Sequence, residues 1–150
     1  MVISKEMNEM SFSVEHFSIR CRDLDKTVAY YESMFGAKVI LRRNLSGSKR
    51  IVYLRLGETM IELMDMGPAL EVADPREYYG VHHLGLKTKD FQAQYHSLKE
   101  KGADFLGEPF EPRKGIHLVF LRDPNGAIIE LSQRDPEIFE EAIAKGTVDW

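Results

Sequence analysis

Apolar residues along this chain follow either the alternating spacing of a strand or the three-to-four-residue spacing of a helix, and these patterns occur in the same order twice. In the first half, alternation predicts a strand over Phe12–Arg22. A helical stripe then predicts a helix that begins after Asp23 and ends before Gly36. Further alternating runs predict three strands, over Lys38–Arg43, Arg50–Leu56 and Thr59–Asp65. The first half therefore predicts a βαβββ unit.

The second half repeats this order after a connecting loop over residues 67–80. A strand is predicted over His82–Lys89, and a helix that has Asp90 as its cap ends at Gly102. The remaining strands are predicted over Ala103–Leu106, over Ile116–Leu121 and after the turn Pro124-Asn125-Gly126. The second half therefore predicts another βαβββ unit.

A last helix is predicted over Asp135–Gly146, with Asp135 as its cap and Pro136 in its first turn. We expect its apolar stripe to pack on the sheet of the same chain, and contact with another subunit is the alternative. The stripe consists of Ile138, Phe139, Ala142 and Ile143.

The two halves also match residue by residue, since His16-Phe17-Ser18-Ile19-Arg20 matches His83-Leu84-Gly85-Leu86-Lys87. A Glu follows the His after 46 positions in one half and 47 in the other. Such self-similarity indicates a duplicated module. We predict an α+β fold in which two βαβββ modules form a curved mixed sheet, a half-barrel, around a metal site. One domain, 1–150, would hold modules at about 13–66 and 81–134, a linker at 67–80 and a C-terminal helix at 135–146.

Composition narrows the function classes. The 20 basic and 24 acidic residues give a net charge of −4, which argues against a nucleic-acid partner. No apolar run approaches the length of a transmembrane helix, and the N-terminus lacks the apolar segment of a signal peptide. The single cysteine, Cys21, excludes an internal disulfide and is expected to be a buried, inert thiol. A cytoplasmic protein is expected.

Strand parity gathers chemistry on one face of each predicted sheet. His16 and Glu62 point away from the apolar face in the first half, and His83 and Glu130 do so in the second. Two imidazoles and two carboxylates suit one divalent metal ion, with Zn or Ni first and Co, Mn or Fe as further options. Such an ion would act as a Lewis acid beside a carboxylate general base. The competing interpretation is that each His and each Glu is structural.

Other side chains on the same faces are candidates for binding substrate. Arg20, Met64 and Lys87 share the polar side, where Arg20 would hold an anionic group unless it forms a surface ion pair. His82 is expected on the helix side or at the strand end, with a structural role, and His117 is expected to stay outside the pocket.

The sequence resembles the vicinal oxygen chelate superfamily over about residues 13–134, whose members build a metal cup from paired βαβββ modules. Three stretches carry the resemblance: His16 to Leu24, Tyr30 to Gly36, and Asp123 to Leu131. The resemblance implies metal ligands at His16, Glu62, His83 and Glu130.

Within that superfamily the first half is most similar to glyoxalase I, because Arg20 lies four residues after the first His. The resemblance implies a lyase that converts the hemithioacetal of a 2-oxoaldehyde and a thiol such as glutathione into a 2-hydroxyacyl thioester. A homodimer is expected, and the modules would pair either within one chain or between two chains, since both arrangements assemble the same ligands. Glu130 would move the proton and Glu62 would be the second base. Met66 stands where bacterial glyoxalase I commonly has Asn. A methylmalonyl-CoA epimerase-like isomerase, a metal-free drug-binding protein and an Fe(II) dioxygenase are the alternatives.

Overall fold

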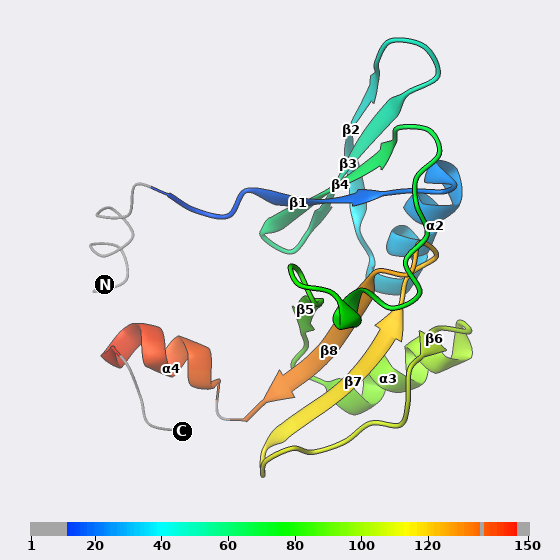
Figure 1. Cartoon of the computed structure of the whole chain (residues 1–150). Coiled ribbons are helices and arrows are strands. Elements are labelled where there is room, and N and C mark those ends of the chain that lie inside the picture. The colour runs from blue at the N-terminus through cyan, green and yellow to red at the C-terminus, as the bar shows by residue number, and fades with distance from the viewer. Residues whose placement is uncertain (1–11, 136, 147–150) are drawn as a thin grey trace.

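Two four-stranded sheets, each with its own helix, make up the fold (Figure 1). The structure is a computed structural model that describes residues 12–135 and 137–146. The first module contains β1 (His16–Arg20), α2 (Leu24–Phe35), β2 (Lys38–Asn44), β3 (Arg50–Leu56) and β4 (Thr59–Asp65). The second contains β5 (Leu84–Lys87), α3 (Phe91–Glu100), β6 (Asp104–Phe105), β7 (Ile116–Arg122) and β8 (Ile128–Arg134). The predicted α+β class with two βαβββ modules is confirmed.

Both sheets have the same topology. Their strand orders are β1-β4-β3-β2 and β5-β8-β7-β6, so the first strand of each module lies parallel to the last and the other pairs are antiparallel. Between the modules runs a loop with a short 3₁₀ helix, η1 (Pro75–Glu77). Both sheets are open rather than closed barrels.

The predicted N-caps of α2 and α3 are confirmed. The Asp23 side chain accepts a hydrogen bond from the backbone N–H of Lys26 at 3.0 Å, and Asp90 accepts one from Ala93 at 3.1 Å. Gly36 ends α2 with φ of 68°, a left-handed conformation that favours glycine. Because capping satisfies N–H groups that have no partner within the helix, these residues set where each helix begins.

The first strand of each module is shorter than the alternation predicts. In β1 the pairing begins at His16, which lies opposite Met60, close to the start of β4. In β5 it begins at Leu84, opposite Ile129. The described residues just before these points, 12–15 and 81–83, are not in strands, and Phe12 is 90 % exposed. His82 and His83 therefore precede the strand that was predicted to contain them.

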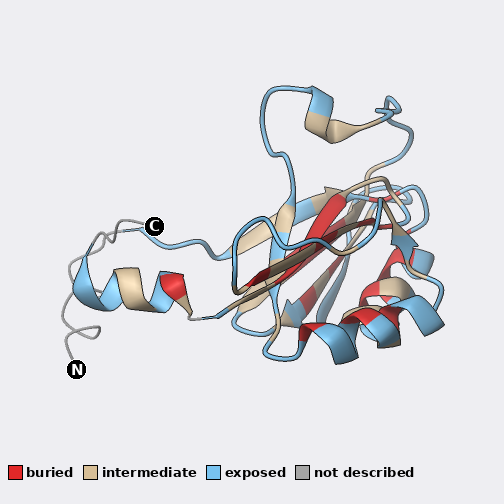
Figure 2. Cartoon of the chain, turned by 90° about the horizontal axis from the view of Figure 1, so that it is seen from below, coloured by how far each residue is buried: buried red, intermediate tan, exposed pale blue. Residues whose placement is uncertain are grey.

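The core lies between each sheet and its helix, where Figure 2 shows the buried residues on the inner helix faces. Tyr31, Leu54 and Ile61 are fully buried in the first module, and Ile129 and Val119 are in the second. Burial of each such side chain stabilises the fold by about 1.5–3 kcal/mol.

The turn before β8 connects the two modules. Asp123 is buried, and it accepts hydrogen bonds from the Tyr31 hydroxyl at 3.0 Å and from the Asn125 backbone N–H at 2.7 Å. Asn125 in turn donates to the Thr27 hydroxyl at 3.1 Å. Burial and the nearby Asp123 carboxylate raise the pKa of Tyr31 well above its usual range. Hydrogen bonds to Tyr31 and Thr27 thus attach this turn of the second module to α2 of the first.

The C-terminal helix α4 (Ile138–Lys145) differs from the prediction in two ways. Its cap is Glu137 rather than Asp135, with no side-chain hydrogen bond, and Pro136 lies outside the described residues. Of the apolar stripe only Ile138 is buried, while Phe139 is 59 % exposed. Figure 2 shows why: the helix projects from the two modules, so its stripe does not pack along a sheet.

Candidate metal and substrate site

The first module places His16 and Glu62 on adjacent strands. His16 Nε2 lies 3.8 Å from Glu62 Oε2, and the Glu62 side chain is 12 % exposed. The Ser18 hydroxyl donates to Glu62 Oε1 at 2.9 Å, and the Tyr53 hydroxyl donates to Oε2. The bond to Glu62 is also the main reason that the pKa of Tyr53 is raised. A carboxylate enclosed to this degree needs such partners, because an unpaired buried charge is costly.

The second module places His83, which directly precedes β5, beside Glu130 on β8. His83 Nε2 lies 3.3 Å from Glu130 Oε2, and the Glu130 side chain is 10 % exposed. The Arg134 guanidinium lies 3.4 Å from the other carboxylate oxygen. The Phe120 ring packs edge-on against the His83 ring with centroids 5.6 Å apart. Each module thus carries one imidazole–carboxylate pair, which we call a half-site.

The donor types fit a divalent transition metal, because imidazole and carboxylate together suit Zn, Ni, Co, Mn or Fe. Within residues 12–135 and 137–146, however, no three His, Cys, Asp or Glu side chains lie close enough to hold one ion. Each half-site supplies two donors, and a four-donor site requires the two half-sites to face each other. The four-residue ligand set stays a prediction.

Arg20 is exposed to solvent, but its guanidinium also contacts its own chain. Its Nη2 lies 3.2, 3.1 and 2.9 Å from the carbonyl oxygens of Met66, Gly67 and Pro68. Met64 is the register partner of Arg20 across the β1–β4 pair. Arg20 therefore anchors the segment after β4.

Lys87, the counterpart of Arg20 in the second module, is also paired within the chain. Its Nζ lies 3.1 Å from a Glu140 carboxylate oxygen on α4, and this bond raises the pKa of Lys87. Each cation that was predicted to bind substrate thus contacts the segment that follows the last strand of its module. Substrate binding by Arg20, Met64 and Lys87 stays a prediction.

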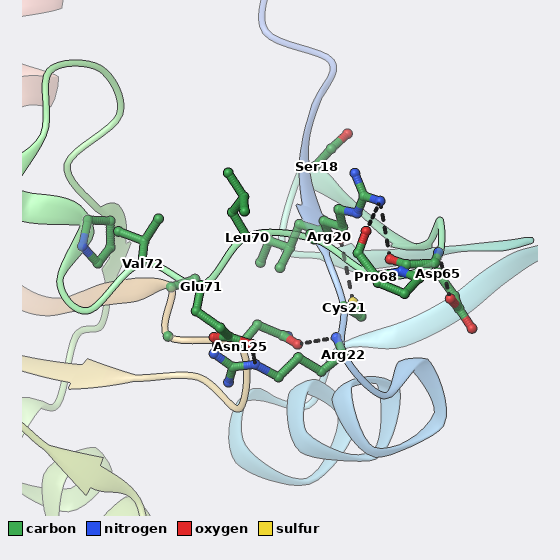
Figure 3. A pocket seen from close by; sticks show the side chains of 16 residues that line it. Ser18, Arg20, Cys21, Arg22, Asp65, Pro68, Leu70, Glu71, Val72 and Asn125 are labelled. Atoms are coloured by element: carbon green, nitrogen blue, oxygen red, sulfur yellow. Dashed lines mark hydrogen bonds and ion pairs between the residues drawn. The ribbon is translucent and has the colours of Figure 1, made fainter.

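A cavity of about 730 Å³ opens beside the first half-site (Figure 3). Ser18 lines this cavity and also donates to Glu62, so Ser18 links the cavity to the half-site, although His16 and Glu62 themselves are not among the lining residues. Figure 3 shows that Arg20, at the end of β1, and Arg22, two residues further on, line it opposite the loop that carries Leu70 and Glu71. Arg22 forms an ion pair with Glu71. The cavity has the size and mixed lining of a small-molecule site.

The remaining candidate residues, His82, His117 and Cys21, lie on the core side of a sheet or at a strand end. His117 packs against the Phe91 ring at 5.8 Å, on the helix side of its sheet, and therefore does not face His83. The Nδ1 atom of His82 lies 2.8 Å from that of His83. Cys21 is buried as predicted, and burial raises the pKa of its thiol to about 11.

Sequence reasoning missed Tyr53 and Arg134. Tyr53 could have been found, because the two-residue turn at Gly57-Glu58 pairs Leu56 with Thr59 and so brings Tyr53 opposite Glu62. Arg134 lies four residues after Glu130 on the same face of β8 and could have been found by the same parity.

Paired βαβββ modules are the fold of the vicinal oxygen chelate class of protein. Residues 13–131 match the Glyoxalase/Bleomycin resistance protein/Dioxygenase superfamily, and the chain belongs to that superfamily.

Similar proteins include enzymes of different activities. The chain is 29 % identical over 124 residues to a putative lactoylglutathione lyase of Brassica oleracea, covering 81 % of this chain and 44 % of that protein. It is 28 % identical over 130 residues to the mitochondrial methylmalonyl-CoA epimerase of Homo sapiens, covering 80 % of this chain and 73 % of that protein. The chain spans less than half the length of the plant relative.

Solved structures share the fold. Glyoxalase I of Leishmania major superposes with a TM-score of 0.70 at 22 % identity, covering 89 % of this chain and 94 % of that one.

In the described part of the chain, no helix is long and apolar enough to cross a membrane.

Proposed function

We propose that this protein is a metal-dependent, glyoxalase I-like lyase that converts the hemithioacetal of a 2-oxoaldehyde and a thiol into a 2-hydroxyacyl thioester. The observation that carries the proposal is the repeated half-site, in which His16–Glu62 and His83–Glu130 occur at equivalent positions of the two modules. Relatives named lactoylglutathione lyase support the same activity.

In this proposal a divalent metal ion, Zn or Ni before Co, Mn or Fe, is held by His16, Glu62, His83 and Glu130. When bound, the ion supplies Lewis-acid catalysis. Glu130 takes the proton from C1 of the hemithioacetal and returns it to C2, and Glu62 is the second base. The enclosure of Glu130 beside Phe120 excludes water from the proton that is transferred.

The half-sites further support a homodimer. Because the described part of one chain gathers no three donors, the four ligands are completed when a half-site of one chain faces the other half-site of a second copy. Closed two-fold symmetry would then give two equivalent sites per dimer.

The test is turnover of methylglyoxal–glutathione hemithioacetal by protein that has been stripped of metal and reloaded with Zn, Ni or Mn, followed by thioester absorbance. Metal-dependent thioester formation that falls at least a thousandfold in Glu130→Gln is the expected result. Metal-loaded protein without turnover would refute the proposal.

A second candidate is an acyl-CoA epimerase, which the similarity to the human epimerase favours. Both reactions move a proton next to a carbonyl, so the same carboxylates would serve. Loss of the α-deuterium from a 2-methyl-branched acyl-CoA, without hemithioacetal turnover, would favour this candidate. A metal-free drug-binding protein is the third, and tight drug binding by metal-free protein would support it.

A further inference from the structure

The two half-sites hold their carboxylates in different ways. Both oxygens of Glu62 accept hydrogen bonds from neutral hydroxyl groups, Oε1 from Ser18 and Oε2 from Tyr53. Among the described residues, no hydroxyl group donates to Glu130, whose side-chain neighbours are the His83 ring at 3.3 Å and the Arg134 guanidinium at 3.4 Å.

This difference arises at positions that the duplication makes equivalent. Ser18 lies opposite Glu62 across the parallel strand pair of the first module, and Gly85 lies opposite Glu130 in the second. Across the antiparallel pair, Tyr53 faces Glu62 and Phe120 faces Glu130. A hydroxyl is therefore present at both flanking positions in one module and absent from both in the other.

The hydroxyl bonds determine how freely each carboxylate can rotate. A carboxylate whose two oxygens are each held by a hydroxyl on a neighbouring strand can rotate only by breaking one of these bonds. Groups that hold a metal ligand in place commonly contribute 10–100-fold to metal affinity. Glu130 lacks such a hydroxyl clamp: its aromatic neighbour, Phe120, offers no donor, and the bond that its Oε1 accepts from Arg134, on the same strand, is long at 3.4 Å.

We infer that Ser18 and Tyr53 are positioning residues that fix Glu62 as a stationary metal ligand. In the second module this hydroxyl clamp is absent, so Glu130, which accepts only the long bond from Arg134, moves toward substrate and transfers the proton. The inference rests on the proposed function, because it divides the ligand and proton-transfer roles between the two carboxylates. Phe120 and Gly85 contribute by lacking a hydroxyl.

The experiment removes hydroxyl groups beside Glu62 and adds one beside Glu130. Tyr53→Phe and Ser18→Ala remove one hydroxyl each from Glu62, and Phe120→Tyr adds one opposite Glu130. Tyr78→Phe is the matched control, because Tyr78 is 61 % exposed and lies in the loop between the modules. Metal dissociation constants are measured by competition with a chromophoric chelator, and kcat and KM are measured against metal concentration.

Tyr53→Phe and Ser18→Ala are expected to weaken metal binding about tenfold each and to regain most of their lost turnover when excess metal is added. Phe120→Tyr is expected to bind metal at least as tightly as the unaltered protein and to lose about tenfold or more in kcat at saturating metal, because the new hydroxyl holds Glu130. Unchanged metal affinity in both Tyr53→Phe and Ser18→Ala, or unchanged kcat in Phe120→Tyr, would overturn the inference.

Failure of the proposed function would look different. In that case the unaltered protein would bind metal without hemithioacetal turnover, and the metal affinities alone would decide whether Ser18 and Tyr53 hold Glu62. Circular dichroism and thermal melting of each variant separate loss of metal from loss of fold, and Ser18→Ala supplies an independent measurement if Tyr53→Phe does not fold.

Discussion

A mixed dimer made from two inactive chains tests whether the half-sites of different chains face each other. One chain carries His16→Ala and the other His83→Ala, so each homodimer lacks one ligand at every site. If the first module of one chain pairs with the second module of its partner, one site of the mixed dimer combines both substitutions. The other site keeps all four ligands.

The expected magnitude follows from this geometry. A purified mixed dimer should show about half the turnover of the unaltered dimer and bind one metal ion in place of two. A random mixture of the two chains should reach about a quarter, because about half of its dimers are mixed. Co-expression with two different affinity tags isolates the mixed species, and thioester formation and metal content are measured on the same sample.

A matched control reverses the outcome. When a chain carrying both His16→Ala and His83→Ala pairs with an unaltered chain, sites shared between chains each lose one His, and the mixed dimer should be inactive. If each chain instead completes its own site, this second dimer keeps half the activity and the first has none. That pattern would refute pairing between chains.

Three further predictions concern the fold around the site. Tyr31→Phe removes the hydroxyl that donates to buried Asp123, and it should lower the free energy of unfolding in urea by about 1–3 kcal/mol. Tyr30→Phe, which loses a longer 3.3 Å bond to a backbone carbonyl, should cost less, and equal losses would contradict the assigned role of Asp123. Burial raises the pKa of Cys21 from 9.0 to about 11, so at pH 8 iodoacetamide should label the folded protein about a hundredfold more slowly than the unfolded chain. The same shift stabilises the folded state below pH 9, and this contribution should be lost as the pH rises through 11, whereas rapid labelling at pH 8 would disprove the burial effect. Arg20→Ala should increase proteolytic cleavage just after β4 several-fold compared with Arg20→Lys, because it removes the anchor to three carbonyl groups, and equal cleavage would exclude that anchor.

Local chemistry explains why so much of the fold could be predicted. β3 and β4 have the predicted bounds, because alternation continues up to both sides of the turn at Gly57-Glu58. Asp23 and Gly36 delimit α2 as predicted, since capping and left-handed glycine geometry depend on residues close in sequence. Parity likewise predicted that His16 lies beside Glu62, because facing directions in a strand repeat every second residue, and His83 lies beside Glu130 although it directly precedes β5.

The errors occurred where alternation continues beyond the partner strand or where packing partners are distant. Phe12 alternates with its neighbours, yet β4 does not extend far enough to pair with it. Phe139 belongs to a helical stripe, yet it packs on the Arg134 guanidinium at 4.8 Å instead of on a sheet. Periodicity reports which face of an element is apolar, and it does not identify the surface that covers that face.

The sequence by itself determined the two modules, their caps and turns, and the pairing of His16 with Glu62 and His83 with Glu130, because duplication and strand parity are local properties that read directly from residue order. Only the tertiary structure decided that Arg20 anchors a loop and that Tyr53 holds Glu62 while Glu130 has no hydroxyl donor among the described residues. The physical reason is distance. A hydrogen bond forms only within about 3 Å, and folding of the chain, rather than spacing in the sequence, decides which donors and acceptors come that close to a long side chain.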